Sequence, residues 1–122
     1  MKTTRYYALT RLLLSCLLLL LLTVTVSAAD IVASGNCGAE GDGSNLTWVL
    51  DSDGVLTISG QGKMADYTTA YSDEDGKPAW YSYRSVLKAL VIRSGVTSIG
   101  SYAFQTCNGF TGNLTIPNSV TS

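Results

Sequence analysis

Apolar and polar residues alternate along the chain after residue 45 in the way that β-strands require. Leu46, Trp48 and Leu50 occupy every second position, and strand-forming residues follow after residue 54. Between these stretches, the segment 51–54 (Asp-Ser-Asp-Gly) has the composition of a turn, and its glycine suits the left-handed backbone of a hairpin loop. The pattern therefore predicts a β-hairpin over residues 46–59.

A second alternating pattern repeats itself near the end of the chain. Leu90–Ser98 lies over Leu114–Ser122 at a shift of 24 residues, and a Leu, an Ile and a Val-Thr-Ser triplet match. A short strand is expected at the Leu-x-Ile positions of each copy, and Pro117, which donates no hydrogen bond, is expected to end the second strand. One such unit is too small to bury its own apolar face, so a repeat at this fixed period predicts a stacked solenoid.

The repeat carries further residues that point to a family. Residues 96–107 run V-T-S-I-G-S-Y-A-F-Q-T-C, and L-T-I-P-N-S-V-T-S follows at 114–122. This segment resembles the BspA-like leucine-rich repeat family of bacterial surface proteins, whose units follow V-x-x-I-G-x-x-A-F-x-x-C-x-x-L-x-x-V-x-I-P-x-S, usually over about 23 residues. The resemblance covers residues 87–122, with one residue more than usual within 110–114. Residues 45–84 also look like the N-terminal region that often precedes such repeats.

A short helix is expected between the hairpin and the repeat. Pro78 suits the first turn of a helix, and Trp80, Tyr83 and Leu87 follow it at helical spacing. The spacing predicts a helix over residues 79–87, whose Trp80 and Tyr83 cover the open apolar end of the first repeat. The alternative is that these two aromatic side chains form an exposed platform for a ligand.

Together these elements predict a mainly β fold, with an N-terminal β-hairpin cap and a short helix leading into a truncated leucine-rich repeat solenoid. We divide the chain into a signal peptide (1–29), a cap region (30–86) and the start of a repeat array (87–122) with about one and a half repeats. Residues 30–45 are rich in glycine and other small residues, and we expect them to be a loose leader into the first strand. Because the sequence stops in mid-repeat, we expect it to be an N-terminal fragment of a longer repeat protein.

The beginning of the chain has the pattern of a secretory signal peptide. Three basic residues precede or open a largely apolar run over 12–26, and Ser-Ala-Ala at 27–29 offers the small residues of a cleavage site. Cleavage near Ala29 predicts a secreted or cell-surface protein that meets the membrane only during export. The alternatives are an uncleaved membrane anchor and lipidation at Cys16.

Cleavage would leave five basic and nine acidic residues, a net charge of −4. This balance argues against nucleic acid as a partner, because neutralising phosphates requires a basic face. Cys37 and Cys107 would remain. They could form one disulfide bond, or Cys107 could be a small buried residue of the repeat core, which is the interpretation we favour. Two cysteines without any histidine predict no metal site, and no cofactor is expected.

The absence of histidine also removes the Ser-His-Asp and Cys-His arrangements of nucleophilic enzymes. Paired carboxylates remain conceivable, as Asp51 with Asp53 or Asp73 with Asp75, but all four lie in polar, turn-like segments that would not raise a proton affinity. Asp51 and Asp53 suit a turn better than a calcium loop, since Gly60 stands where an EF-hand needs a glutamate. The acidic run around Asp73 is expected to be a solvated loop. We therefore expect no enzyme and assign no catalytic, cofactor-binding or metal-ligating residue.

The resemblance implies a binding or adhesion module whose partners are proteins or cell-surface ligands. Binding residues stay unassigned at this stage, because the binding face of a solenoid spreads over many repeats. Two other classes stay open: a structural spacer that presents another domain, and an accessory region of a longer surface enzyme. Two N-x-T sequons, at Asn45 and Asn113, would matter only in a eukaryotic secretory path.

Overall fold

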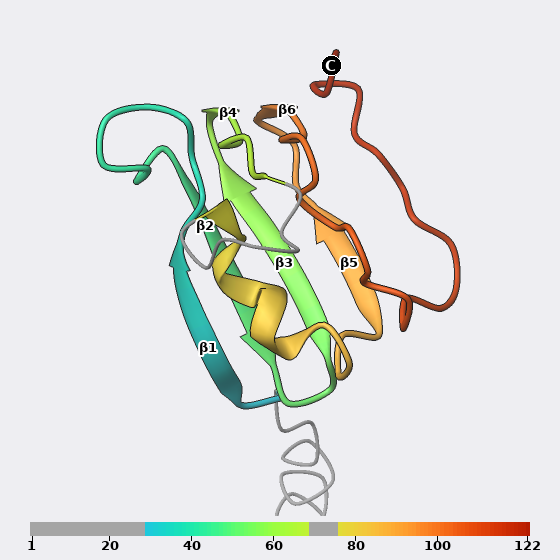
Figure 1. Cartoon of the computed structure of the whole chain (residues 1–122). Helices are drawn as coiled ribbons and strands as arrows, with labels where there is room; N and C mark the ends of the chain where they lie inside the picture. The colour runs from blue at the N-terminus through green and yellow to red at the C-terminus, as the bar shows by residue number, and fades with distance from the viewer. Residues whose placement is uncertain (1–28, 69–75) are drawn as a thin grey trace, which may run out of the picture.

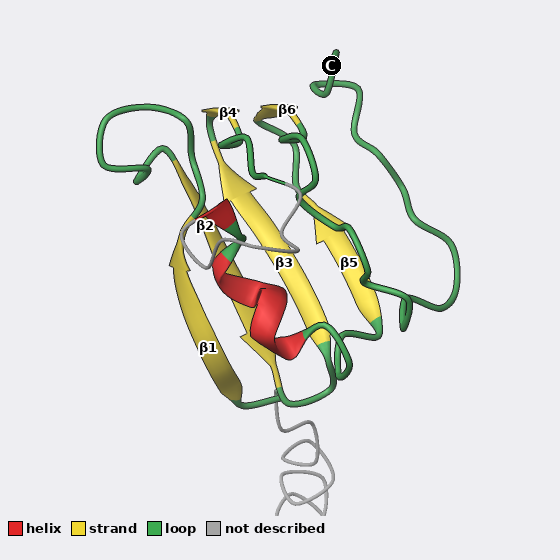
Figure 2. Cartoon of the chain, viewed as in Figure 1, coloured by secondary structure: helices red, strands yellow, loops and turns green. Residues whose placement is uncertain are grey.

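The computed structural model describes residues 29–68 and 76–122, which form a twisted sheet with a short helix lying across one of its faces (Figure 1). The predicted signal peptide, apart from Ala29, and the acidic run at 73–75 lie outside the described residues. Strand and loop dominate the described chain (Figure 2), so the fold is mainly β, as the sequence predicts. The elements are β1 (Ile31–Asn36), β2 (Leu46–Asp51), β3 (Val55–Gly60), β4 (Gly62–Lys63), the 3₁₀ helix η2 (Ala79–Tyr83), β5 (Ala89–Ile92) and β6 (Val96–Ser98).

The main sheet has four strands in the order β1-β2-β3-β5. β2 and β3 form the predicted hairpin, antiparallel and with Trp48 opposite Ile58. The turn between them is fixed by Asp51, whose carboxylate accepts the backbone N–H groups of Asp53 at 2.9 Å and Val55 at 3.0 Å. Gly54 has a φ of 79°, the left-handed conformation that the sequence predicts for this position.

The prediction of a loose leader before the hairpin is wrong, because residues 31–36 form the edge strand β1. β1 pairs antiparallel with β2, with Gly35 opposite Trp48. The glycine is needed there, since a Cβ at Gly35 would lie only 2.9 Å from the indole nitrogen of Trp48. An edge strand is held mainly by main-chain hydrogen bonds to its one neighbour, and so it needs little of the alternation that reveals a strand in sequence.

Residues 55–64, which were expected to belong to the cap, form a coil of the solenoid. β3 pairs in parallel with β5, with Leu56 beside Leu90 and Ile58 beside Ile92. β4 then pairs in parallel with β6, with Gly62 beside Val96. The stacking that the repeat predicts is therefore present, and it begins one coil earlier than expected.

A third coil follows along 113–122 and contacts the second near its end. The backbone N–H of Gly95 donates to the hydroxyl of Ser119 at 3.2 Å, and the N–H of Thr121 donates to the carbonyl of Thr97 at 3.0 Å. Both contacts keep the shift of 24 residues that the sequence shows.

The second predicted repeat strand, at 114–116, is not formed. Leu114 is 51% exposed and Ile116 42% exposed, and the chain that follows the hydrogen bond from the N–H of Thr111 to the carbonyl of Lys88 bows away from β5 in Figure 1. We attribute the departure to the one extra residue within 110–114. Gly112 turns the chain there with a φ of 85°, and the segment is one residue too long to pair in register with β5.

The predicted helix over 79–87 is also shorter than expected. It is a 3₁₀ helix over Ala79–Tyr83, followed by turns in which Arg84 and Val86 bond to carbonyls three residues earlier. Pro78 is its N-cap, so the predicted start is nearly right. The segment is rich in aromatic residues, which are weak helix formers, and packing rather than propensity sets its length.

One hydrophobic core lies between the sheet and η2, and it joins the expected cap to the expected repeat. Trp80 is fully buried at its centre, stacked on Phe104 with ring centroids 5.6 Å apart and edge-on to Trp48 at 5.9 Å. Its indole N–H donates to the carbonyl of Ala103 at 2.8 Å. The buried apolar residues are Cys37, Leu46, Trp48, Leu50, Leu56, Ile58, Met64, Trp80, Leu87, Ile92, Val96 and Ala103.

Candidate interaction face

The main sheet has one buried face and one open face. In β2, Leu46, Trp48 and Leu50 are buried against η2, whereas Thr47 is exposed and Val49 half-buried. β3 alternates in the same way along its length. Because successive side chains of a strand point to opposite faces, the half-buried and exposed set lies on the face that η2 does not cover.

Two rows of side chains cross this open face from strand to strand. The register aligns Ser34, Val49, Thr57 and Val91 in the first row. It aligns Asn36, Thr47 and Ser59 in the second row. We call these seven residues the open face.

None of the seven residues of the open face is charged. Its members are two valines and five side chains with a hydroxyl or amide group, among them Thr57 near the centre. The hydroxyls of Thr47 and Ser59 lie 3.4 Å apart, and Val91 is 38% exposed. Such a surface supplies apolar contact and neutral hydrogen bonds, which are the contacts found between docked protein surfaces.

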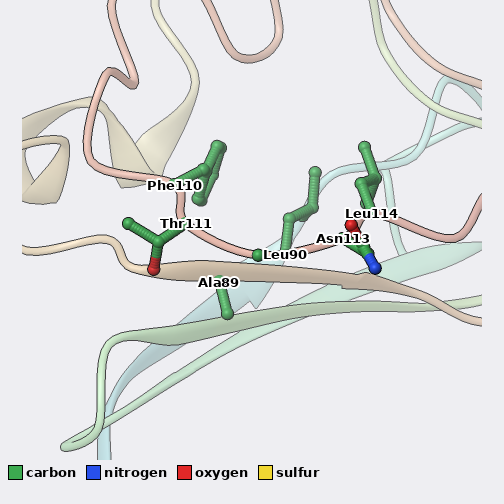
Figure 3. A pocket seen from close by; sticks show the side chains of 7 residues that line it. Ala89, Leu90, Phe110, Thr111, Asn113 and Leu114 are labelled. Carbon is green, nitrogen blue, oxygen red and sulfur yellow. The ribbon is translucent and has the colours of Figure 1, made fainter.

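Two small hollows lie where the third coil bows away from β5. The first, of about 60 Å³, is lined by Ala89, Leu90, Phe110 and Leu114 among others (Figure 3). The second, of about 310 Å³, continues it along Val91 and Ile92. Both are by-products of the unformed strand at 114–116, and their lining residues bear no ionisable side chain.

The acidic residues considered as carboxylate pairs have a structural role where they are described. Asp51 holds the hairpin turn with its carboxylate, and Asp53 is exposed at the tip of the same turn. Asp73 and Asp75 lie outside the described residues. In residues 29–68 and 76–122, no cluster of three or more His, Cys, Asp or Glu side chains could hold a metal ion.

Cys37 and Cys107, the two cysteines in the part of the chain that the structure describes, are unpaired. Cys37 is buried in the core, where burial raises the pKa of its thiol to about 11. Cys107 is half-buried and packs against the same core, close to the role that its repeat position predicts. Burial raises the pKa of the Cys107 thiol, and the nearby charge of Arg84 opposes that rise. Both thiols are therefore held in the neutral, weakly reactive form.

Trp80 and Tyr83 of η2 belong to the core rather than to an exposed platform. Trp80 is enclosed by Trp48, Tyr67 and Phe104, and Tyr83 is half-buried against the core. Trp80 reaches the Ala103-Phe104 pair of the first repeat, as a residue that caps the repeat is expected to do.

The two sequons differ in their surroundings. Asn45 uses its side chain inside the fold: its amide N–H groups donate to the carbonyls of Gln61 and Lys63, and its oxygen accepts the N–H of Glu40. Asn113 is exposed beside the first hollow. The side chain of Asn45 therefore serves to hold the β3–β4 corner in place.

The sequence analysis assigned no binding residues, although a signal for the open face is present. Leu56-Thr57-Ile58 and Leu114-Thr115-Ile116 are identical triplets, and Leu90-Val91-Ile92 shares their outer positions. The middle residue of a Leu-x-Ile strand points away from the core. Comparing these three triplets would have identified Thr57 and Val91 as residues of a shared open face.

Comparison with known proteins gives one clear point of similarity. No family model and no curated protein matches the chain. A leucine-rich repeat protein of known structure from Eubacterium ventriosum is 38% identical over 65% of this chain, with a TM-score of 0.49. The match covers 19% of that protein, so this chain spans about a fifth of its length. Over that stretch, the chain is similar in sequence to a leucine-rich repeat protein.

Proposed function

We propose that this chain is the N-terminal part of a secreted, BspA-like leucine-rich repeat protein that binds other proteins at the cell surface. The observation that carries the proposal is the open face, an uncharged surface that crosses the stacked coils and that no described element covers. Its extension by further coils would give the broad surface on which solenoid proteins bind partners. The A-F-x-x-C and I-P-N-S motifs support the BspA-like assignment.

The proposal includes binding without catalysis and an extracellular location. The chain has no histidine, and the carboxylate of Asp51 is engaged by backbone amides, which supports a binding role. The apolar run at 12–26 followed by small residues supports export. N-terminal sequencing of the protein recovered from the culture medium or cell wall checks this part, with Asp30 as the expected first residue.

The binding role is tested by site-specific photocrosslinking on cells that express the protein at their surface. A benzophenone amino acid replaces Val91 on the open face in one chain and Ser52, at the tip of the hairpin turn, in a matched control. We expect a defined crosslinked protein from position 91, absent from position 52. We also expect Thr57→Lys to abolish that crosslink, because a charge in the centre of an uncharged interface is costly to desolvate.

Equal crosslinking from both positions, or a crosslink at position 91 that persists in the Thr57→Lys chain, would contradict binding through the open face. Circular dichroism of each variant establishes that the sheet is retained.

A further inference from the structure

A second candidate site lies on the opposite side of the molecule from the open face, on the segment that carries η2. Tyr81 is half-buried there, and two cations lie over its ring. The ammonium of Lys77 is 4.7 Å from the ring centroid, and the guanidinium carbon of Arg84 is 4.2 Å from it. Each cation is attracted by the electron-rich face of the ring, which helps to hold both charges beside Tyr81.

Arg84 is held in place by more than its contact with the ring. Its side chain donates to the carbonyl of Tyr81 at 3.0 Å, and its backbone N–H donates to the same carbonyl at 3.2 Å. Only one of the five donors of the guanidinium is used in this way, so the rest of the planar fork remains available for a ligand. A pre-positioned arginine loses little freedom when it binds.

The two cations border an open hollow of about 350 Å³, lined by Lys77, Pro78, Ala79, Tyr81, Ser82 and Arg84. None of these residues is acidic, and the carboxylates in the described part of the chain belong to residues 30–66. The exposed hydroxyl of Ser82 adds a neutral hydrogen-bond donor at the same place. The hollow therefore combines the guanidinium of Arg84, the ammonium of Lys77 and the hydroxyl of Ser82, and none of its lining residues is a counter-ion for the two cations.

The geometry points to a carboxylate-binding site: we propose that Lys77, Ser82 and Arg84 receive an acidic side chain of a protein partner. A carboxylate fits the guanidinium fork with two parallel hydrogen bonds. The ring of Tyr81 already carries two cations, so it is poorly placed to stack on a sugar. The hollow is also wide and open, which suits a side chain presented on a surface. This inference rests on the proposed function for the nature of the partner, but it uses a different face of the molecule.

The site is tested by titrating the exported, purified chain with an Asp-rich hexapeptide and following its ¹⁵N amide and arginine Nε signals by NMR. We expect signals of Tyr81, Ser82 and Arg84 to shift, and the shifts to shrink as salt is raised. Lys77→Gln and Arg84→Gln should each weaken the affinity by about five-fold, the size of one exposed charge interaction. Lys63→Gln removes an equal charge from an exposed position on β4 and should leave the affinity unchanged.

The titration is repeated on a chain with D73N, E74Q and D75N, so that acids close in sequence cannot take the place of the peptide. No shift at Tyr81 in either chain, or an equal loss of affinity in Lys63→Gln, would overturn the proposal. So would stronger binding of a heparin fragment that depends on the same two cations, since this would assign the site to anionic glycans. Crosslinking from position 91 is scored separately, so failure of this site is distinguishable from failure of the open face.

Discussion

At the scale of single residues, close approach of two backbones explains why particular glycines stand in the repeat. Gly100 of the Ile-Gly-x-x-Ala-Phe segment lies against Ala65, where an added Cβ would collide with the backbone carbonyl oxygen. Gly112 differs, because its φ of 85° demands glycine while nothing lies within 4 Å of the Cβ position. One glycine is therefore fixed by packing between coils and the other by backbone conformation alone.

This difference predicts unequal costs for the same substitution. Gly100→Ala should lower the free energy of unfolding by about 3 kcal/mol or more, since backbone must move to admit the methyl group. Gly112→Ala should cost only about 1 kcal/mol, the penalty for a left-handed alanine. Urea unfolding followed by tryptophan fluorescence measures both. Equal costs would mean that the coils do not approach each other at Gly100.

Thr106 is a second residue whose backbone predicts a measurable effect. It is β-branched and has a φ of 64°, a conformation that such residues rarely adopt. Thr106→Asn should raise the free energy of unfolding by about 0.5–1 kcal/mol, because asparagine tolerates this conformation at lower cost. Thr111→Asn, at an exposed position without positive φ, is the matched control and should change stability by less than about 0.5 kcal/mol. A loss of stability in Thr106→Asn would show that the threonine side chain is needed there.

Cys37 and Tyr67 predict a dependence of stability on alkaline pH. Burial raises the pKa of the Cys37 thiol to about 11, and burial followed by the nearby Cys37 raises the pKa of Tyr67 to about 12. The unfolded chain loses these protons at lower pH than the folded chain, so the free energy of unfolding should fall as the pH rises from 9.0 towards 11. Cys37→Ala should flatten this decline over that range, as measured by urea titrations at several pH values. An unchanged slope in Cys37→Ala would remove Cys37 as a cause.

At the scale of elements, the sequence predicts those whose conformation is set by neighbouring residues. It does not predict strands that form only by pairing with a distant segment. The hairpin is confirmed because alternation at Leu46–Leu50 and the turn residues around Gly54 act within a few positions. β1 was missed because it is defined by pairing with β2 and carries no alternation of its own. The strand expected at 114–116 has the Leu-x-Ile alternation, but Leu114 and Ile116 are exposed. We attribute this to the extra residue within 110–114, which puts the segment out of register with β5. Comparison of the Leu-x-Ile triplets identifies only Thr57 and Val91 of the open face, and its other residues could be assigned only once the register had aligned four strands.

The leucine of the Leu-x-Ile triplet is therefore expected to contribute differently to stability in the first and third coils. Leu56 is fully buried, whereas Leu114 is 51% exposed. Leu56→Ala should lower the free energy of unfolding by about 2–5 kcal/mol, whereas Leu114→Ala should lower it by less than about 1 kcal/mol. Chemical denaturation of the two variants is the measurement. A large cost at Leu114 would indicate that the third coil packs on β5 in solution.

At the scale of the whole molecule, the cap and the repeat form one structure. The boundary predicted after residue 86 separates β3 from β5, yet these two strands belong to the same sheet, and Trp80 joins Trp48 to Phe104 across that position. The parallel pairing of β3–β4 with β5–β6 makes residues 55–64 the first coil of the stack. It also aligns Thr57 with Val91, so the open face of the first coil continues into the second. The open face depends on this continuity, because a separate cap would leave each coil with too small a surface to bind a partner.

Cross-strand nuclear Overhauser contacts in solution test this continuity most directly. Parallel pairing predicts backbone contacts between Leu56 and Leu90, between Ile58 and Ile92, and between Gly62 and Val96. Their presence would establish that the solenoid starts within the cap. Their absence, in a spectrum that still shows the antiparallel contacts of β2 with β3, would contradict the account and leave the cap as a separate unit.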